Sequence, residues 1–402
     1  MSTKLIEGAA VIGQSGGPTA VINQSLVGIV EGLKGLKPIT KIFGMRHGVT
    51  GLIKNYPLVD LGAVPHETLE KVARTPSAAL GSSRDKPTEA DCAKIFDACK
   101  AQQIRYFFYI GGNDSSDTCR IVSEMGKKSG YELRCFHVPK TVDNDLMMND
   151  HTPGFGSAAR FVAMAFMADN QDNRSLPGVK INVVMGRNAG FLTAASALAR
   201  QGEDDGPHLV YVPEVPFDTD EFIKDVEATL HRLGRCQIAV SEGIKDKDGT
   251  DIGAKLIAGE KDSHGNAQLS GSGALGDMLA NLVKAKVKTP NGKAPRVRAD
   301  TLGYLQRCWP EPSPVDAAEA RAVGLYAAQQ ASMGIHEGSV AINRVSNHPY
   351  RVEKRLIGLG EVAAKTRHLP PEFIQGRHDV TRAFIDYCRP LVGELPTLGR
   401  LG

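Results

Sequence analysis

Short apolar runs recur along this chain, and each ends in a loop of glycine or polar residues before a helical pattern begins. In two clear cases the run 9–12 precedes the helical pattern 21–33, and the run 181–185 precedes the pattern 191–199. Strand, loop and helix in alternation predict parallel sheets with helices on both faces. Because the carboxyl ends of parallel strands lie at one edge of a sheet, we expect a ligand to bind where these loops gather.

Four further apolar runs, at 104–110, 135–138, 209–212 and 236–240, are predicted strands of the same kind. Between residues 245 and 295 the composition shifts to Gly, Lys, Asp and Ser, with one helical stretch at 275–285. We therefore expect an insertion in that region.

Composition places the chain among globular enzymes. With 402 residues, 42% hydrophobic and 23% charged, it can form two domains with sizeable cores. A net charge of +3 without a block of Lys and Arg argues against nucleic-acid binding. The longest apolar runs fall short of a membrane-spanning helix, so we expect no membrane insertion. Seven cysteines without a Cys-x-x-Cys pair predict a reducing, cytoplasmic setting.

The loop Ser15-Gly-Gly-Pro-Thr is a weak signal by itself. A glycine pair after a strand is often a simple turn, but Gly16 and Gly17 could also admit an anion to the positive end of the following helix. The spacing matches neither the dinucleotide-binding fingerprint nor the Walker loop, which disfavours a Rossmann dehydrogenase.

Two acidic loops carry a more specific signal. One is Gly111-Gly-Asn-Asp-Ser115, and the other, Pro139 to Asp145, packs a lysine, a threonine and two aspartates into one short segment. If that segment is extended, Asp143 and Asp145 point to the same side, so that one could accept a hydroxyl proton while the other helps to hold Mg²⁺. An Asx-rich turn that caps backbone amides is the alternative. The crowding of both loops favours phosphoryl transfer.

Eight motifs together resemble the phosphofructokinase family, in order and approximate spacing over about residues 8–345, and the resemblance favours its pyrophosphate-dependent branch. They are Ser15-Gly-Gly, Gly81-Ser-Ser-Arg84, Gly111-Gly-Asn-Asp-Ser115, Pro139-Lys-Thr-Val-Asp-Asn-Asp145, Met185-Gly-Arg187, Ser241-Glu242, Arg298 and Leu302-Gly-Tyr-Leu-Gln-Arg307. The later Lys365-Thr-Arg-His-Leu-Pro also resembles that branch.

The resemblance implies two Rossmann-like three-layer α/β/α domains with mainly parallel sheets and an active site in the cleft between them. A donor domain would comprise residues 1–154 and about 306–345, and a fructose 6-phosphate domain residues 155–305 and about 346–402. A homo-oligomer, either a homodimer or a homotetramer, is implied as well, because some arginines of this family reach the site of a neighbouring subunit.

The same resemblance implies a role for each site residue. Asp143 would take the proton from the 1-hydroxyl of fructose 6-phosphate, with Lys140, Thr141 and Arg187 assisting the transfer to give fructose 1,6-bisphosphate and phosphate. Pyrophosphate would contact Gly16, Gly17, Arg84, Asp114, Ser115 and Lys140. The sugar phosphate would contact Thr141, Asp143, Met185, Gly186, Arg187, Glu242, Arg298, Tyr304 and Arg307. Mg²⁺ would be held by Asn113, Asp114 and Asp145.

Donor choice depends on Asp114 and Lys140, where ATP-using relatives have glycine. A carboxylate at Asp114 would repel the α-phosphate of a nucleotide, and Lys140 would neutralise compact pyrophosphate. An ATP-dependent 6-phosphofructokinase and a non-catalytic regulatory subunit that binds sugar phosphates remain the alternatives. Two histidines near these motifs, His151 and His368, are expected to be loop or surface residues rather than catalysts.

Overall fold

The computed structural model describes residues 6–85, 87–253 and 272–400. The chain forms two compact units, each with its own sheet. Unit 1 comprises residues 1–157 and 307–367, and unit 2 comprises residues 158–306 and 368–402. Within the described residues, no helix combines the length and the apolar character that crossing a membrane requires.

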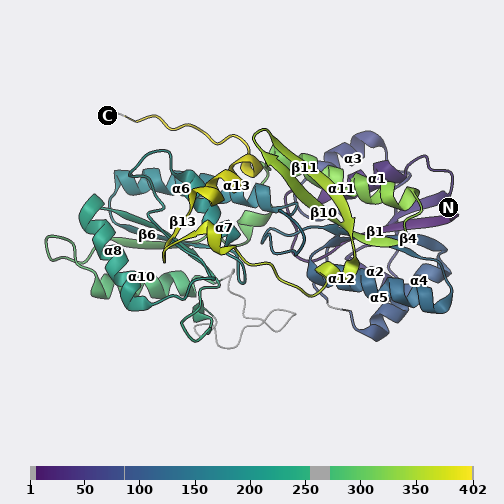
Figure 1. The fold of residues 1–402 in the computed structure, drawn as a ribbon, viewed down its shortest axis with the longest axis horizontal. Helices are drawn as coiled ribbons and strands as arrows, with labels where there is room; N and C mark the ends of the chain where they lie inside the picture. The colour runs from purple at the N-terminus through teal and green to yellow at the C-terminus, as the bar shows by residue number, and fades with distance from the viewer. Residues whose placement is uncertain (1–5, 86, 254–271, 401–402) are drawn as a thin grey trace. The chain divides into compact units, whose positions relative to one another are not determined.

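Unit 1 contains a seven-stranded sheet in the order β11-β10-β5-β4-β1-β2-β3 (Figure 1). The five central strands are parallel, and β3 and β11 pair antiparallel at the two edges. Its elements are β1 (Gly8–Gln14), α1 (Ile22–Leu33), β2 (Ile39–Gly44), α2 (Val49–Ile53), β3 (Val59–Asp60), α3 (His66–Ala73), α4 (Glu89–Ala101), β4 (Ile104–Gly111), α5 (Asn113–Ser129), β5 (Arg134–Pro139), α11 (Pro314–Ser332), β10 (Glu337–Asn347), β11 (Tyr350–Ile357) and α12 (Leu359–Val362).

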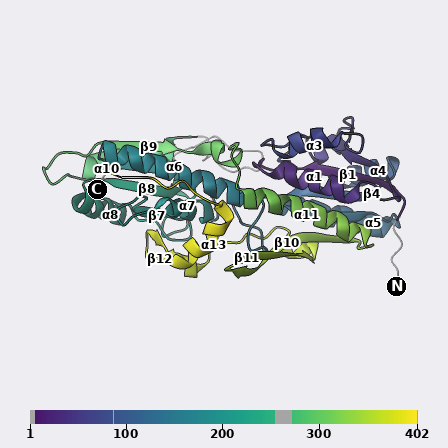
Figure 2. The same ribbon diagram turned by 90° about the horizontal axis from the view of Figure 1, so that it is seen from above.

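Helices cover both faces of this sheet because its central strands are apolar on both sides. In β1, Ala10 and Ile12 pack into a core with α1, α3 and α11, whereas Ala9 and Val11 pack into a second core with α2, α4 and α5. This alternation follows from the two-residue period of a strand. Figure 2 shows α1 and α11 side by side over one face. The predicted strands and the α/β class are confirmed here.

Unit 2 contains a four-stranded parallel sheet in the order β7-β8-β6-β9. Its elements are α6 (Phe155–Ser175), which begins in unit 1, β6 (Val179–Val184), α7 (Phe191–Ala195), η1 (Ser196–Ala199), β7 (Leu209–Tyr211), α8 (Thr219–Leu233), β8 (Cys236–Ser241), α10 (Ala274–Lys286), β9 (Val297–Thr301), η2 (Gly303–Arg307), η3 (Pro371–Phe373), β12 (Ile374–Gln375), β13 (Asp379–Val380) and α13 (Arg382–Val392).

One face of this second sheet is apolar and the other has buried polar contacts. Phe222 of α8 and Leu279 of α10 pack with Ile181 and Ile238 of the sheet. On the other face, Asn182 Nδ2 donates a hydrogen bond to Asp169 Oδ2 of α6 at 2.8 Å. Figure 1 shows α6 opposite α8 and α10.

The division between the units differs from the expected boundary in one place. Residues 346–367 were assigned to the second domain, but they belong to unit 1. The reason is β11, which pairs antiparallel with β10 and so completes the sheet of unit 1. The insertion expected at 245–295 falls partly outside the described residues, at 254–271, while its predicted helical stretch is present as α10.

Candidate active site

The carboxyl ends of β1, β4 and β5 lie next to one another in unit 1. The register pairs Gln14 with Ile110 and Gly111 with Pro139, so the three strands end in one row. From β1 the chain runs first to β2 on one side and later to β4 on the other, which makes this edge a topological switch point. The loops that follow the three strands therefore meet where a ligand is expected.

A second loop, residues 81–84, holds the glycine pair in place. Gly16 has a φ of +73°, a conformation that favours glycine. Its N–H donates to the carbonyl of Ser83 at 2.8 Å, and its own carbonyl accepts from Ser82 Oγ at 2.6 Å. These bonds bring Arg84 to the same edge of the sheet as the glycine loop.

Gly111 lies too close to its neighbours to carry a side chain. A Cβ there would collide with the hydroxyls of Ser15 and Ser115, which hydrogen-bond to each other. Ser115 was predicted to bind pyrophosphate, but its side chain is buried beneath this turn. Its contacts indicate that it shapes the loop.

Lys140, directly after β5, is buried beside the glycine loop, with 3% of the residue exposed. Its ammonium donates to the carbonyl of Gly17 at 2.8 Å. Burial, together with the positive charges of Arg307 and Arg84, lowers the pKa of Lys140 to about 7, and neighbouring carboxylates oppose this only in part. Such a concentration of positive charge is stabilised by an anion.

The acidic loop is a turn and not an extended segment. Asn144 has a φ of +60°, so the extended conformation that would have aligned Asp143 and Asp145 by strand alternation does not occur. The hydroxyl of Thr141 accepts from the N–H of Asp143 at 3.1 Å and donates to the Asp145 carboxylate. Burial and the charge of Asp143 raise the pKa of Asp145 to about 7, which shows that the turn brings the two acids together.

Asn113 and Asp114 begin helix α5 immediately after β4. Asn113 Oδ1 is buried and has no hydrogen-bond partner among the described residues. Asp114 is exposed in the first turn of α5, where the helix dipole favours negative charge. Because Asp114 is exposed, solvent screens the repulsion by which it was predicted to disfavour a nucleotide.

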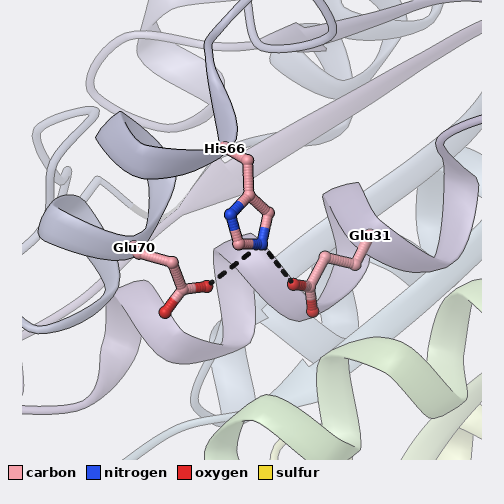
Figure 3. A group of neighbouring side chains, drawn as sticks. All are labelled: Glu31, His66 and Glu70. Carbon is pink, nitrogen blue, oxygen red and sulfur yellow. Dashed lines mark ion pairs between the residues drawn. The ribbon is translucent and has the colours of Figure 1, made fainter.

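The described residues contain one group of three His or carboxylate side chains close enough to share a metal ion, and it lies elsewhere. Figure 3 shows this group, which consists of Glu31, His66 and Glu70. Arg321 donates hydrogen bonds to both of its carboxylates, so part of their charge is already balanced. The predicted magnesium ligands Asn113, Asp114 and Asp145 include only two carboxylates, so substrate oxygens would have to complete the coordination of the ion.

In unit 2, the ends of β6 and β8 place Met185, Gly186 and Glu242 together. The buried Glu242 accepts a hydrogen bond from the N–H of Gly186 at 3.4 Å, and Ser241 Oγ donates to the carbonyl of Gly186 at 2.7 Å. Gln306 Oε1 accepts from the N–H of Met185 at 3.3 Å, a contact that the sequence analysis did not anticipate. Arg187 follows directly, and its backbone packs against Gly243.

The three residues predicted to hold the 6-phosphate fall in two different units, Arg298 and Tyr304 in unit 2 and Arg307 in unit 1. Arg298 is exposed near the start of β9, opposite Lys180, and lies about 10 Å along the strand from its carboxyl end. Tyr304 is exposed in η2. Arg307 belongs to unit 1, and its guanidinium packs against Gly17. This position adds a cation beside the glycine loop, whereas Arg307 had been predicted to contact the sugar phosphate.

Two basic side chains that precede the Met185-Gly-Arg187 motif, Lys180 and Arg174, are held by carboxylates of their own unit. Lys180 Nζ lies 2.9 Å from Asp169 Oδ1 and 2.6 Å from Asp172 Oδ2. Arg174 Nη2 lies 3.2 Å from Asp205 Oδ1. The histidines differ from each other: His368 is exposed, with Nδ1 2.7 Å from the carbonyl of Asn188, whereas His151 is buried.

Known proteins resemble this chain in both sequence and structure. The family model for phosphofructokinase matches residues 9–331. The pyrophosphate--fructose 6-phosphate 1-phosphotransferase of Rhodospirillum rubrum is 53% identical over 99% of this chain and 97% of its own length. The protein of the same name from Halomonas elongata is 36% identical over 95% and 91%. The crystal structure of a pyrophosphate-dependent phosphofructokinase from Marinobacter aquaeolei matches with a TM-score of 0.84 and 32% identity, covering 98% of this chain and 94% of that one.

Proposed function

Because the chain belongs to the phosphofructokinase family, we propose that it transfers a phosphoryl group from pyrophosphate to the 1-hydroxyl of fructose 6-phosphate. The products are fructose 1,6-bisphosphate and phosphate, and the reaction is reversible. The relatives and the solved structure described above bear names for this activity. Unit 1 is the proposed donor domain, and unit 2 the proposed sugar domain.

The observation that carries this proposal is the position of Lys140. Its buried ammonium lies at the centre of the donor loops, where a Cβ added to Gly16 would come within 2.9 Å of it. Arg84 and Arg307 lie close enough to depress its pKa. A small and highly charged anion fits such a corner, and pyrophosphate has that character.

The acidic loop supplies the proton chemistry. Asp143 is the proposed base for the 1-hydroxyl, and its backbone N–H is fixed by the hydroxyl of Thr141. Lys140, Arg84 and Arg307 would neutralise charge on the transferring group. No covalent intermediate with the protein is required, because positioning and charge neutralisation are sufficient for phosphoryl transfer.

Mg²⁺ is the proposed cofactor, and the residues present fit it. The raised pKa of Asp145 indicates a carboxylate pair that a divalent cation would relieve, and the buried amide oxygen of Asn113 has no other hydrogen-bond partner among the described residues. Asp145 and Asn113 would hold the ion, with Asp114 at the edge of the site. The ion would supply positive charge to the pyrophosphate oxygens.

On the acceptor side, Met185, Gly186, Arg187 and Glu242 are the proposed sugar contacts. The exposed position of Arg298 suits a residue that serves a neighbouring subunit, so a homo-oligomer belongs to the proposal. We also place the enzyme in the cytoplasm, where its phosphorylated substrates would be found.

The experiment that tests this proposal is a donor exchange with matched variants. Purified protein is assayed with fructose 6-phosphate and Mg²⁺, using pyrophosphate or ATP, and compared with the double variant Asp114→Gly, Lys140→Gly. The proposal expects turnover with pyrophosphate and its loss in the double variant. Efficient use of ATP by the unaltered protein would support an ATP-dependent kinase instead. Binding of fructose bisphosphate without turnover from either donor would support a regulatory subunit.

A further inference from the structure

A buried histidine lies in the segment that follows the acidic loop. His151 is 2% exposed, with Nδ1 2.7 Å from Asp150 Oδ2 and Nε2 2.6 Å from Glu319 Oε2 of α11. Both ring nitrogens face carboxylate oxygens, so both can donate only if the ring is an imidazolium. Burial opposes the charge, but the two carboxylates prevail and raise the pKa of His151 to about 9.

Two more side chains complete this charged group. Arg344 of β10 donates from Nε to Asp150 Oδ2 at 3.0 Å, and the Tyr350 hydroxyl of β11 donates to Glu319 Oε1 at 2.6 Å. Two positive and two negative charges therefore balance within a largely buried cluster. Because a buried charge left without its partner is costly, the cluster favours one arrangement of α11, β10 and the segment that carries His151.

The next residue connects this cluster to the acidic loop. Thr152 donates from its N–H to Asn144 Oδ1 at 3.1 Å and from its hydroxyl to the carbonyl of Thr141 at 2.8 Å. Asn144 has the left-handed backbone conformation that gives the turn its shape. Thr152 thus contacts Thr141 and Asn144, and Asn144 lies between Asp143 and Asp145 in the chain.

Other contacts hold the far end of the same segment. Both carboxylate oxygens of Asp316 accept hydrogen bonds, from the N–H of Gly154 at 2.9 Å and from the N–H of Ser157 at 2.9 Å. The segment is therefore fixed on either side of Thr152 by buried carboxylate contacts from α11.

Direct participation of His151 in the reaction is excluded by its contacts. A general acid or base must reach the reacting group, whereas both ring nitrogens of His151 are held by carboxylates and the ring is not exposed. A histidine that only filled the core would not require a carboxylate at each ring nitrogen, as His151 has. A role that acts through neighbouring residues accounts for both its burial and its two carboxylate partners.

We propose that His151 is a positioning residue for phosphoryl transfer: held as an ion between Asp150 and Glu319, it fixes Thr152 and thereby the turn that presents Asp143. The inference rests on the proposed function, because it assigns Asp143 to the acceptor hydroxyl. It adds a charged clamp, formed by Asp150, His151, Glu319 and Arg344, on which the geometry of that base depends.

The test compares three variants of the full-length protein. His151→Gln removes the charge, and Glu319→Gln keeps the shape and a hydrogen-bond acceptor for Tyr350 but removes one of the two carboxylates that raise the pKa of His151. The matched control is His66→Gln, because His66 is exposed, also lies 3.8–3.9 Å from two carboxylates (Figure 3), and is outside the segment 139–154. kcat and both KM values are measured from pH 6 to pH 10, with one substrate varied while the other is saturating.

For His151→Gln we expect kcat to fall roughly 10- to 100-fold, with KM values within about threefold of the unaltered enzyme. For Glu319→Gln we expect the alkaline loss of kcat to begin at lower pH, because His151 then keeps only Asp150 and loses its proton more readily. His66→Gln should match the unaltered enzyme throughout.

A variant that is only less stable gives a different result from one in which the base is misplaced. If kcat per folded molecule and the pH profile of Glu319→Gln match the unaltered enzyme, the positioning role is wrong, even if both variants melt earlier. Should His151→Gln not fold, Glu319→Gln decides.

Hydrogen exchange of the peptide that spans residues 139–154 gives a readout that does not require turnover. Faster exchange in His151→Gln or Glu319→Gln than in the unaltered protein at the same pH supports the clamp, and unchanged protection overturns it. If the unaltered protein shows no turnover, the proposed function is wrong. The exchange measurement still tests whether the charged clamp fixes the turn, because it does not depend on turnover.

Discussion

Replacing Lys140 with methionine should have opposite effects on activity and on the stability of the free enzyme. Methionine has nearly the same shape as lysine but lacks the charge. The pKa of Lys140 falls from 10.5 to about 7, and a difference of that size corresponds to about 5 kcal/mol by which the empty site disfavours the ammonium. Loss of the 2.8 Å hydrogen bond to the carbonyl of Gly17 costs roughly 1–3 kcal/mol in return. We therefore expect Lys140→Met to raise the free energy of unfolding at pH 7 by about 2 kcal/mol.

The sign of this effect depends on pH in a defined way. Lys140 has a lower pKa in the folded protein than in the unfolded chain. Its charge therefore lowers the free energy of unfolding by the full amount below about pH 7, and this cost fades as the pH rises toward 10.5. The gain in Lys140→Met should fade over the same range. Denaturant unfolding at pH 6, 7 and 9 measures it.

Activity should change in the other direction. A buried ammonium that contacts a phosphate contributes about 3–4 kcal/mol in the transition state, so kcat/KM for pyrophosphate should fall about 100- to 1000-fold. Stabilisation of the protein by added pyrophosphate should fall as well. A variant that is less stable at pH 7, or that keeps kcat/KM within about tenfold of the unaltered enzyme, would refute the account of Lys140 as an anion-binding cation.

Three further predictions address the same loops. Asp143→Asn should reduce kcat by about 10²- to 10⁴-fold while fructose 6-phosphate still binds, which calorimetry and a coupled assay would show together; weakened binding with unchanged kcat would contradict its role as the base. The affinity for a non-hydrolysable pyrophosphate analogue should fall as the pH rises above about 7, where the free enzyme loses the Lys140 proton, and Lys140→Arg should remove this dependence; an identical slope in both proteins would contradict it. Gly111→Ala should lower both stability and activity because a Cβ collides with the Ser15 and Ser115 hydroxyls, and an alanine variant with unchanged melting temperature would show that the turn can yield.

Much of the fold could be predicted because the strands of this protein are short, apolar and followed by loops of small residues. The strands β1, β4, β5, β6, β7 and β8 all lie where apolar runs predicted them. The edge strand β11 was not predicted, because its residues alternate between exposed and partly buried and include many charged side chains. Without it, the sequence offered no reason to place residues 346–367 in unit 1.

The candidate site was predictable where function depends on loops that directly follow a strand. Lys140 and Asp143 come together with the glycine loop because β1, β4 and β5 end in one row. The ionisation of His151 could not be read from the sequence, since Glu319 lies 168 residues away on α11. Residues 306–345 were assigned to the donor domain and Arg307 does lie in unit 1, but its contact with Gly17 is a result of folding that the motif did not predict.

The central claim is that the donor loops accept pyrophosphate and disfavour a nucleotide. The most direct measurement is kcat/KM for pyrophosphate and for ATP, taken on the same preparation with fructose 6-phosphate and Mg²⁺. We predict that the value for pyrophosphate exceeds that for ATP by at least about 100-fold, which corresponds to a few kcal/mol of discrimination. An ATP value equal to or greater than that for pyrophosphate would contradict the account.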